Sequence, residues 1–202
     1  RSVSGNPVRP IFYSGNEKEG RKFLGFPSDR PILLVLGGSQ GAQQINELIA
    51  KILPELLKDW AIVHQTGNAA KGIPSAQPGY LPLSYIYDEL PHVLAASSLV
   101  LCRSGAGNLW ESAAVGKPML LIPLAASSRG DQVENAQWFV ARGAAQSLVG
   151  PEATAPALLA ALQNLAGDGA KRQAMAQASK ALGKGNASEL IAEKLQSYVS
   201  ME

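Results

Sequence analysis

The chain has 202 residues, the length of one typical domain or two small ones, which excludes a large multidomain enzyme. Hydrophobic residues make up 46% and charged residues 17%, a globular composition that excludes a disordered segment. The 18 basic and 16 acidic side chains leave a net charge of +2, so we expect no nucleic-acid partner. The single cysteine, Cys102, excludes an internal disulfide and fits a reducing compartment.

No apolar run approaches the roughly 18 residues that a membrane-spanning helix needs. The chain begins at Arg1 without an initiator methionine and without a secretory signal pattern, so we expect it to be part of a larger protein. Residues 1–30 are polar and rich in Gly, Pro and Asn, which predicts a linker that leads into the fold, with one short charged helix near residues 17–23.

Short apolar runs alternate with helical patterns from residue 31 onward. Strands are predicted at 32–36, 61–65, 80–86, 99–102, 119–122 and 144–148, and helices at 42–57, 89–95, 109–115 and 132–141. Continuous apolar strands separated by helices are typical of a parallel sheet that is covered on both faces. We therefore predict a doubly wound α/β fold.

The last fifty residues are predicted to be helical. Helices are expected at 156–165, from a cap at Asp168 through residue 181, and at 189–199. The final helix repeats apolar side chains at Ile191, Leu195, Tyr198 and Val199. These side chains pack either on the sheet or on a partner outside this chain.

Two glycine-rich loops follow predicted strands and open helices. Residues 36–42 read Leu-Gly-Gly-Ser-Gln-Gly-Ala, and residues 102–108 read Cys-Arg-Ser-Gly-Ala-Gly-Asn. Glycines allow close backbone approach, and helix N-termini attract phosphate, although a lone loop of this kind could equally be a tight structural turn. Two such loops would flank one crevice at the sheet edge where α/β sheets bind ligands. Together they favour an anionic, nucleotide-like ligand.

Other polar residues are consistent with that ligand or with structural roles. Glu111 lies one helical turn beyond the second loop, where its carboxylate could accept hydrogen bonds from a ribose or could be a solvated acid. Asp131 could read sugar hydroxyls or cap the following helix. We expect Cys102 to be a buried small hydrophobe rather than a nucleophile, and we recognise no metal site around His64 or His92.

Several motifs in order carry a family resemblance from about residue 4 to about residue 146. They are 5–9 (Gly-Asn-Pro-Val-Arg), 37–42 with Asn46, 102–111, 116–118 (Gly-Lys-Pro), Pro123 and 131–136 (Asp-Gln-Val-Glu-Asn-Ala). In these motifs the chain resembles the MurG family, the bacterial peptidoglycan N-acetylglucosaminyltransferases that convert lipid I to lipid II. The resemblance implies the Rossmann-like C-terminal half of a GT-B glycosyltransferase. It assigns residues 31–185 to the domain that binds the UDP-sugar donor and residues 186–202 to a helix that packs on an absent N-terminal domain.

The resemblance also implies partners and a location. UDP-N-acetylglucosamine is the expected donor, and lipid I is the acceptor through the absent N-terminal half, which carries the probable catalytic base. No cofactor and no metal are expected. The full-length protein is expected to contact the cytoplasmic face of the bacterial inner membrane peripherally. We expect this chain alone to bind the donor weakly and to transfer nothing.

Carried over residue by residue, the resemblance places Arg9 and Tyr87 near the uracil, Ser39 at the diphosphate and Glu111 at the ribose hydroxyls. The implied substrate-binding set is Arg9, Gly38, Ser39, Gln40, Tyr87, Ser104, Gly105, Ala106, Asn108, Glu111, Asp131 and Gln132. Asp131 and Gln132 would face the N-acetylglucosamine hydroxyls. The alternatives are another GT-B transferase that uses a UDP-sugar, such as a glycolipid synthase or a two-subunit enzyme, and a non-catalytic nucleotide-binding module.

Overall fold

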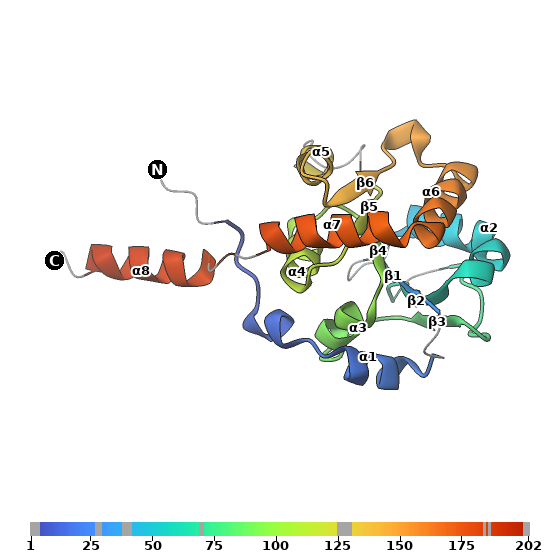
Figure 1. The fold of residues 1–202 in the computed structure, drawn as a ribbon, viewed down its shortest axis with the longest axis horizontal. Helices are drawn as coiled ribbons and strands as arrows, with labels where there is room; N and C mark the ends of the chain where they lie inside the picture. The colour runs from blue at the N-terminus through green and yellow to red at the C-terminus, as the bar shows by residue number, and fades with distance from the viewer. Residues whose placement is uncertain are drawn as a thin grey trace.

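The computed structural model describes residues 5–26, 30–37, 42–68, 71–124, 131–183, 185 and 187–199. Its centre is a six-stranded sheet in the order β3-β2-β1-β4-β5-β6, in which neighbouring strands pair in parallel (Figure 1). The strands are β1 (Ile32–Leu36), β2 (Ala61–Gln65), β3 (Tyr80–Leu83), β4 (Leu99–Cys102), β5 (Met119–Leu121) and β6 (Ala145–Ser147). The predicted α/β fold is confirmed.

Helices cover both faces of this sheet (Figure 1). They are η1 (Pro10–Ser14), α1 (Glu17–Leu24), α2 (Gln43–Asp59), α3 (Leu90–Ala96), α4 (Ala106–Val115), α5 (Asp131–Val140), η2 (Gly150–Glu152), α6 (Ala155–Gly167), α7 (Gly169–Leu182) and α8 (Ala187–Val199). Because side chains alternate along a strand, Leu34 belongs to the core beneath α3, α4 and α5, whereas Leu33 belongs to the core beneath α2 and α6.

Strand β3 ends earlier than the sequence predicts. Its partner β2 ends at Gln65, and the two segments separate after the Thr66 and Gly67 amides donate to the Leu83 and Ser84 carbonyls at 2.9 and 3.1 Å. The Gln65 side chain instead accepts a hydrogen bond from the Ile86 amide at 3.2 Å. This contact turns the chain out of the sheet towards α3.

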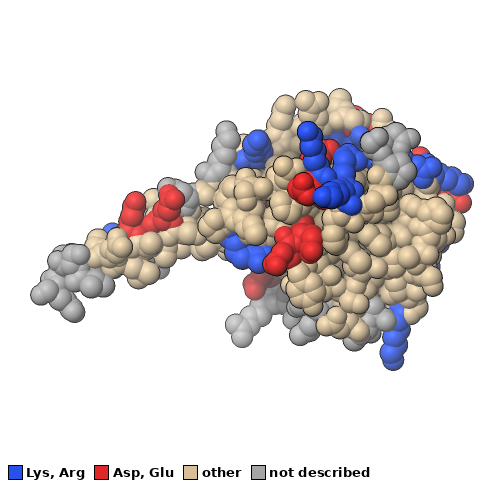
Figure 2. Space-filling view, turned by 90° about the horizontal axis from the view of Figure 1, so that it is seen from below, with Lys and Arg blue, Asp and Glu red and all other residues tan. Residues whose placement is uncertain are grey.

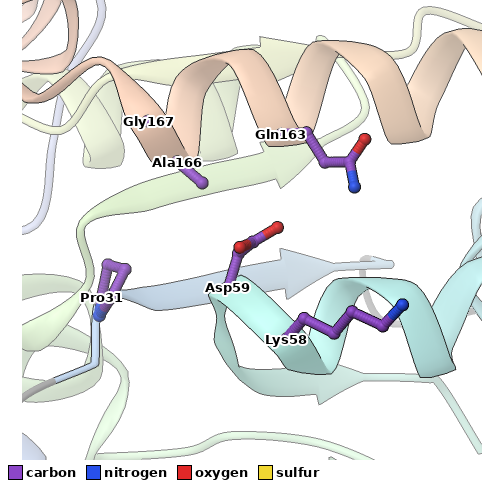
Figure 3. A pocket seen from close by; sticks show the side chains of 6 residues that line it. All are labelled: Pro31, Lys58, Asp59, Gln163, Ala166 and Gly167. Carbon is purple, nitrogen blue, oxygen red and sulfur yellow. The ribbon is translucent and has the colours of Figure 1, made fainter.

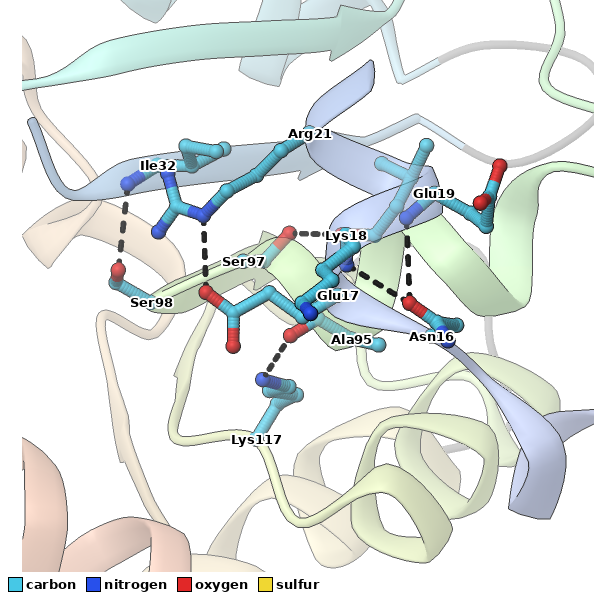
Figure 4. Close-up of polar contacts among 11 residues, drawn as sticks. Asn16, Glu17, Lys18, Glu19, Arg21, Ile32, Ala95, Ser97, Ser98 and Lys117 are labelled. Atoms are coloured by element: carbon cyan, nitrogen blue, oxygen red, sulfur yellow. Dashed lines mark hydrogen bonds and ion pairs between the residues drawn. The ribbon is translucent and has the colours of Figure 1, made fainter. Parts of the chain in front are cut away.

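Most of the predicted N-terminal linker folds against the domain. The Phe12 side chain is only 1% exposed, and α1 packs along α3. Asn16 caps α1, since its Oδ1 accepts from the amides of Lys18 and Glu19 at 2.9 and 3.2 Å (Figure 4). Gly20 allows the close approach of the two helices.

The amino-terminal edge of the sheet is tied together by further polar contacts (Figure 4). The Ile32 amide donates to Ser98 Oγ at 3.3 Å, and Lys117 Nζ donates to the Ala95 carbonyl at 2.7 Å. Burial lowers the pKa of Lys117 to about 8. A hollow at this same edge is lined by Pro31, Lys58, Asp59, Gln163, Ala166 and Gly167 (Figure 3).

Helix α8 extends away from the body of the domain (Figure 1). Leu195 and Tyr198 are each 62% exposed, and Leu190 is 43% exposed. The start of α8 is joined to the N-terminal segment by Tyr13, whose hydroxyl donates to the Gly185 carbonyl at 3.1 Å. Within the described residues, no helix is long and apolar enough to cross a membrane.

Candidate functional site

The carboxyl ends of β1, β4 and β5 lie side by side in the sheet. The chain leaves β1 towards β2 and leaves β4 towards β5, on opposite sides, so the strand order reverses between β1 and β4. Open α/β sheets bind ligands at this kind of switch point. The two predicted glycine-rich loops follow these two strands, although Gly38, Ser39 and Gln40 lie outside the described residues.

The second loop opens directly into α4, which begins three residues earlier than the sequence predicts. Gly105 is the N-cap, and no side chain caps the helix. The first amides of a helix have no partner within it and carry a partial positive charge. A Cβ added at Gly105 or Gly107 would meet no atom of the described residues within 4 Å. Ala106 and Asn108 lie in the same first turn.

Arg9 and Glu111 meet beside this helix although 102 residues separate them in sequence. Arg9 Nη2 lies 3.1 Å from Glu111 Oε1, and Arg9 Nε lies 3.3 Å from the same oxygen. Burial raises the pKa of Glu111, and the hydrogen bond and charge of Arg9 act in the opposite direction. The Arg9 guanidinium also lies 4.8 Å from the centre of the Phe12 ring. The structure therefore brings together two residues that the resemblance places in one site.

Ser104 and Gln132 connect the second loop with α5. Ser104 is fully buried, and its hydroxyl donates to the Gln132 carbonyl at 2.6 Å. The Gln132 side-chain oxygen accepts from the Leu124 amide at 3.0 Å. Asn135 donates to the Ser104 carbonyl at 3.2 Å. Ser104 thus acts as a structural link, and Asp131 lies exposed at the start of α5.

Tyr87 lies on the loop between β3 and α3 and is 71% exposed. Its ring centre is 4.6 Å from that of Tyr85, at a tilt of 58°. An exposed aromatic pair of this kind offers a surface on which a planar group could pack.

A buried polar network that joins α2, β2 and β3 was not predicted. His64 Nε2 lies 2.9 Å from Asn46 Oδ1, and His64 Nδ1 lies 3.0 Å from the Tyr80 hydroxyl. Asn46 donates through its amide nitrogen to the Thr66 carbonyl at 3.0 Å. Its oxygen is therefore the acceptor for His64 Nε2–H, and the Tyr80 hydroxyl donates to Nδ1. Burial lowers the pKa of His64 to about 4, so the ring is neutral and fixes the start of α2.

Arg103 was also missed, although it follows a buried strand directly. Its Nη1 donates to Gln44 Oε1 at 2.9 Å, to the Ile122 carbonyl at 2.9 Å and to the Pro123 carbonyl at 3.4 Å. An arginine between an apolar strand and a glycine-rich loop is the signal that could have indicated such a link, since a half-buried guanidinium needs several acceptors.

Two other kinds of candidate site, a reactive cysteine and a metal site, are not found among the described residues. Burial raises the pKa of Cys102 to about 12, which confirms the interpretation of its thiol as a buried small hydrophobe. Groups of three or more His, Cys, Asp or Glu that could hold a metal do not occur in the described ranges. On the face shown in Figure 2, acidic and basic side chains are interspersed.

The strand order and the switch point between β1 and β4 define a Rossmann-like α/β domain, a class that binds ligands at the carboxyl ends of its strands. Residues 32–195 match the glycosyltransferase family 28 C-terminal domain, and the chain belongs to that family. The fold is that of the C-terminal half of a GT-B glycosyltransferase, which confirms the fold class that the resemblance implies.

Individual relatives agree with this assignment. The chain is 42% identical, over 96% of its length, to the UDP-N-acetylglucosamine--N-acetylmuramyl-(pentapeptide) pyrophosphoryl-undecaprenol N-acetylglucosamine transferase of Treponema denticola. It is 40% identical, over 82% of its length, to the protein of that name from Lachnospira eligens. The crystal structure of Acinetobacter baumannii MurG aligns with a TM-score of 0.75 at 23% identity, covering 98% of this chain and 57% of that one. The chain spans about half the length of the curated relatives it matches, 54% and 48% for these two.

Proposed function

We propose that this chain is the donor-binding half of a glycosyltransferase that moves N-acetylglucosamine from UDP-N-acetylglucosamine to the C4 hydroxyl of lipid I, forming lipid II. The activity named for the two relatives supports the donor and the acceptor class. The observation that carries the site is the Arg9–Glu111 pair beside the open N-terminus of α4.

Different residues would bind the ribose, the diphosphate, the sugar and the uracil of the donor. A carboxylate accepts several hydrogen bonds, so Glu111 can hold a ribose diol while Arg9 remains bound to it. The amides of Gly105, Ala106 and Gly107 and the dipole of α4 would face the diphosphate. Gln132 and Asp131, at the start of α5, would meet the sugar hydroxyls, and the exposed Tyr87 would pack near the uracil.

The reaction is an inverting displacement at the anomeric carbon. The acceptor hydroxyl attacks carbon 1, the bond to the diphosphate oxygen breaks, and UDP leaves with additional negative charge. The N-terminus of α4 can stabilise this charge because its amides are already oriented before the reaction. A base must take the acceptor proton, and we assign that base, the lipid I site and the peripheral contact with the cytoplasmic face of the inner membrane to the other half of the protein.

Donor selectivity tests this proposal. Titrations of the chain with UDP-N-acetylglucosamine, UDP-glucose, UDP-galactose and UDP are expected to give the tightest binding for the N-acetylglucosamine donor. With lipid I added, the chain alone is expected to release no UDP. Preference for UDP-galactose or UDP-glucose would instead indicate another UDP-sugar transferase. Tight binding of UDP with no contribution from any sugar would indicate a nucleotide-binding module without transferase function.

A further inference from the structure

Arg103 occupies a special position in the sheet. It is the first residue after β4, and β4 lies between β1 and β5. Its side chain therefore lies between the carboxyl ends of β1 and β5. A long side chain at this point can reach both neighbouring loops, whereas a residue after an edge strand could reach only one.

The hydrogen bonds of Arg103 extend to both sides of β4. On one side, Nη1 donates to Gln44 in the first turn of α2, directly after the loop that follows β1. On the other side, the same nitrogen donates to the carbonyls of Ile122 and Pro123, where the chain leaves β5. One guanidinium thus joins the start of α2 to the chain that leaves β5.

The charge of Arg103 is not neutralised by these contacts. All three acceptors are uncharged amide oxygens, whereas Arg9 and Arg21 are paired with carboxylates. The side chain is half-buried, and an arginine stays protonated in such a place. Its positive charge therefore remains at the edge of the sheet where an anionic ligand would lie.

We propose that Arg103 is a positioning residue for the donor diphosphate: it fixes the start of α2, at Gln44, relative to the chain that leaves β5, at Ile122 and Pro123. The inference rests on the proposed function, because it assumes that a nucleotide diphosphate binds at this edge. Small displacements of binding groups weaken a preorganised site strongly. The segment proposed to contact the uracil, which carries Tyr87, is positioned by a contact that does not involve Arg103: the Ile86 amide donates to the Gln65 side chain.

Because different contacts hold the diphosphate side and the uracil side, the two can be tested separately. A general loss of stability would weaken both, whereas loss of Arg103 should weaken only the diphosphate side. Arg103→Met is expected to bind UDP about tenfold more weakly, while the affinity for uridine, followed by NMR titration, stays within about twofold. Arg103→Lys keeps the charge but lacks the planar, forked donors, so it is expected to weaken UDP binding as well. Gln44→Met removes only the contact on the β1 side and is expected to show a smaller loss.

Arg142→Met is the matched control. Arg142 stacks on Trp138 at 3.7 Å and donates to the Trp138 carbonyl at 3.1 Å, at the far end of α5. The Arg142→Met substitution removes the same positive charge but leaves the contacts of Arg103 intact. UDP binding by this variant is therefore expected to equal that of the wild type. Circular dichroism and thermal melting establish that each variant is folded.

The outcomes separate the two claims. If the wild type binds UDP and both folded Arg103 variants bind it equally well, Arg103 has no positioning role and only this inference is overturned. An equal loss for UDP and uridine would also overturn it, because the effect would then not be confined to the diphosphate. If the wild-type chain binds no UDP at all, the proposed function itself is wrong and the inference falls with it.

Discussion

Arg9 and Glu111 form an ion pair with unequal surroundings: the Arg9 side chain is 67% exposed, whereas that of Glu111 is 18% exposed. An ion pair with so exposed a partner contributes only about 0–1 kcal/mol to folding. Its main consequence is therefore local, because Arg9 keeps a partly buried carboxylate charged and oriented beside α4.

Removing Arg9 is expected to raise the pKa of Glu111 further. Burial already raises this pKa, and the hydrogen bond and charge of Arg9 oppose that effect. Arg9→Ala removes the opposing interactions, whereas Arg9→Lys retains the charge and is expected to give an intermediate value. NMR titration of the Glu111 carboxyl carbon measures the change. An unaltered pKa in Arg9→Ala would show that the pair does not form in solution.

The buried histidine predicts a pH dependence of stability. The pKa of His64 is about 4 in the folded chain and 6.5 in an unfolded one, so between these values the unfolded chain binds more protons. The contribution of His64 is fully present above about pH 6.5 and declines as the pH falls towards 4, by on the order of 3 kcal/mol in all.

His64→Leu separates this effect from the titration of carboxylates. The variant is expected to be less stable at pH 7 by about 1–3 kcal/mol, because Asn46 and Tyr80 each lose a buried partner. It is also expected to lose less stability than the wild type between pH 6.5 and 4.5. Urea unfolding at several pH values measures both. Equal losses in the two proteins would contradict the assignment of a neutral, buried His64.

Gly20 is expected to be essential for docking α1. A Cβ at this position would collide with the backbone carbonyl of His92, which cannot move as a side chain does. Gly20→Ala is expected to cost about 1–3 kcal/mol, despite the better helix propensity of alanine. Gly169→Ala is the control, since the nearest atom to its Cβ is the end of the Arg172 side chain at 3.8 Å. Thermal unfolding compares the two, and equal melting temperatures would refute the close contact.

Helix α8 is expected to contribute little to the stability of this chain. Leu195 and Tyr198 are largely exposed, so replacing either with alanine should change the free energy of unfolding by less than about 0.5 kcal/mol. Ile49→Ala in α2, which is fully buried, should cost about 2–5 kcal/mol. We also expect the α8 amides to exchange rapidly, or the chain to self-associate through this helix. Slow exchange in a sample shown to be monomeric by light scattering would contradict this.

The sequence predicts the elements that depend on local pattern. The runs at 32–36 and 61–65 coincide with β1 and β2, which are buried on both faces: β1 is apolar throughout, and β2 is apolar in its first three residues before His64 and Gln65. The predicted end of β3 was wrong because the strand ends where its pairing with β2 ends. The apolar pattern of residues 80–86 does not encode that position. The packing of α1 depends on the absence of a Cβ at Gly20. In the sequence alone, a glycine at this position is equally consistent with a linker.

The site was predictable only where motifs indicate it. The resemblance places Arg9 near the uracil and Glu111 at the ribose hydroxyls of the same donor, and the structure brings the two side chains into contact, which the resemblance did not predict. The links made by Arg103 and His64 depend on contacts between residues far apart in the chain, so neither spacing nor composition indicates them. The roles assigned to Gly38, Ser39 and Gln40 fall outside the described residues and stay predictions.

The most direct test of the proposed function is a calorimetric titration of this chain with UDP-N-acetylglucosamine, comparing the wild type with Glu111→Gln. Glu55→Gln is the control, since Glu55 is exposed and pairs with Lys58 away from the crevice. We expect the wild type and the control to bind alike, and Glu111→Gln to bind at least about tenfold more weakly. Equal binding by the folded Glu111→Gln variant, or no binding by the folded wild type, would contradict a donor site at the N-terminus of α4.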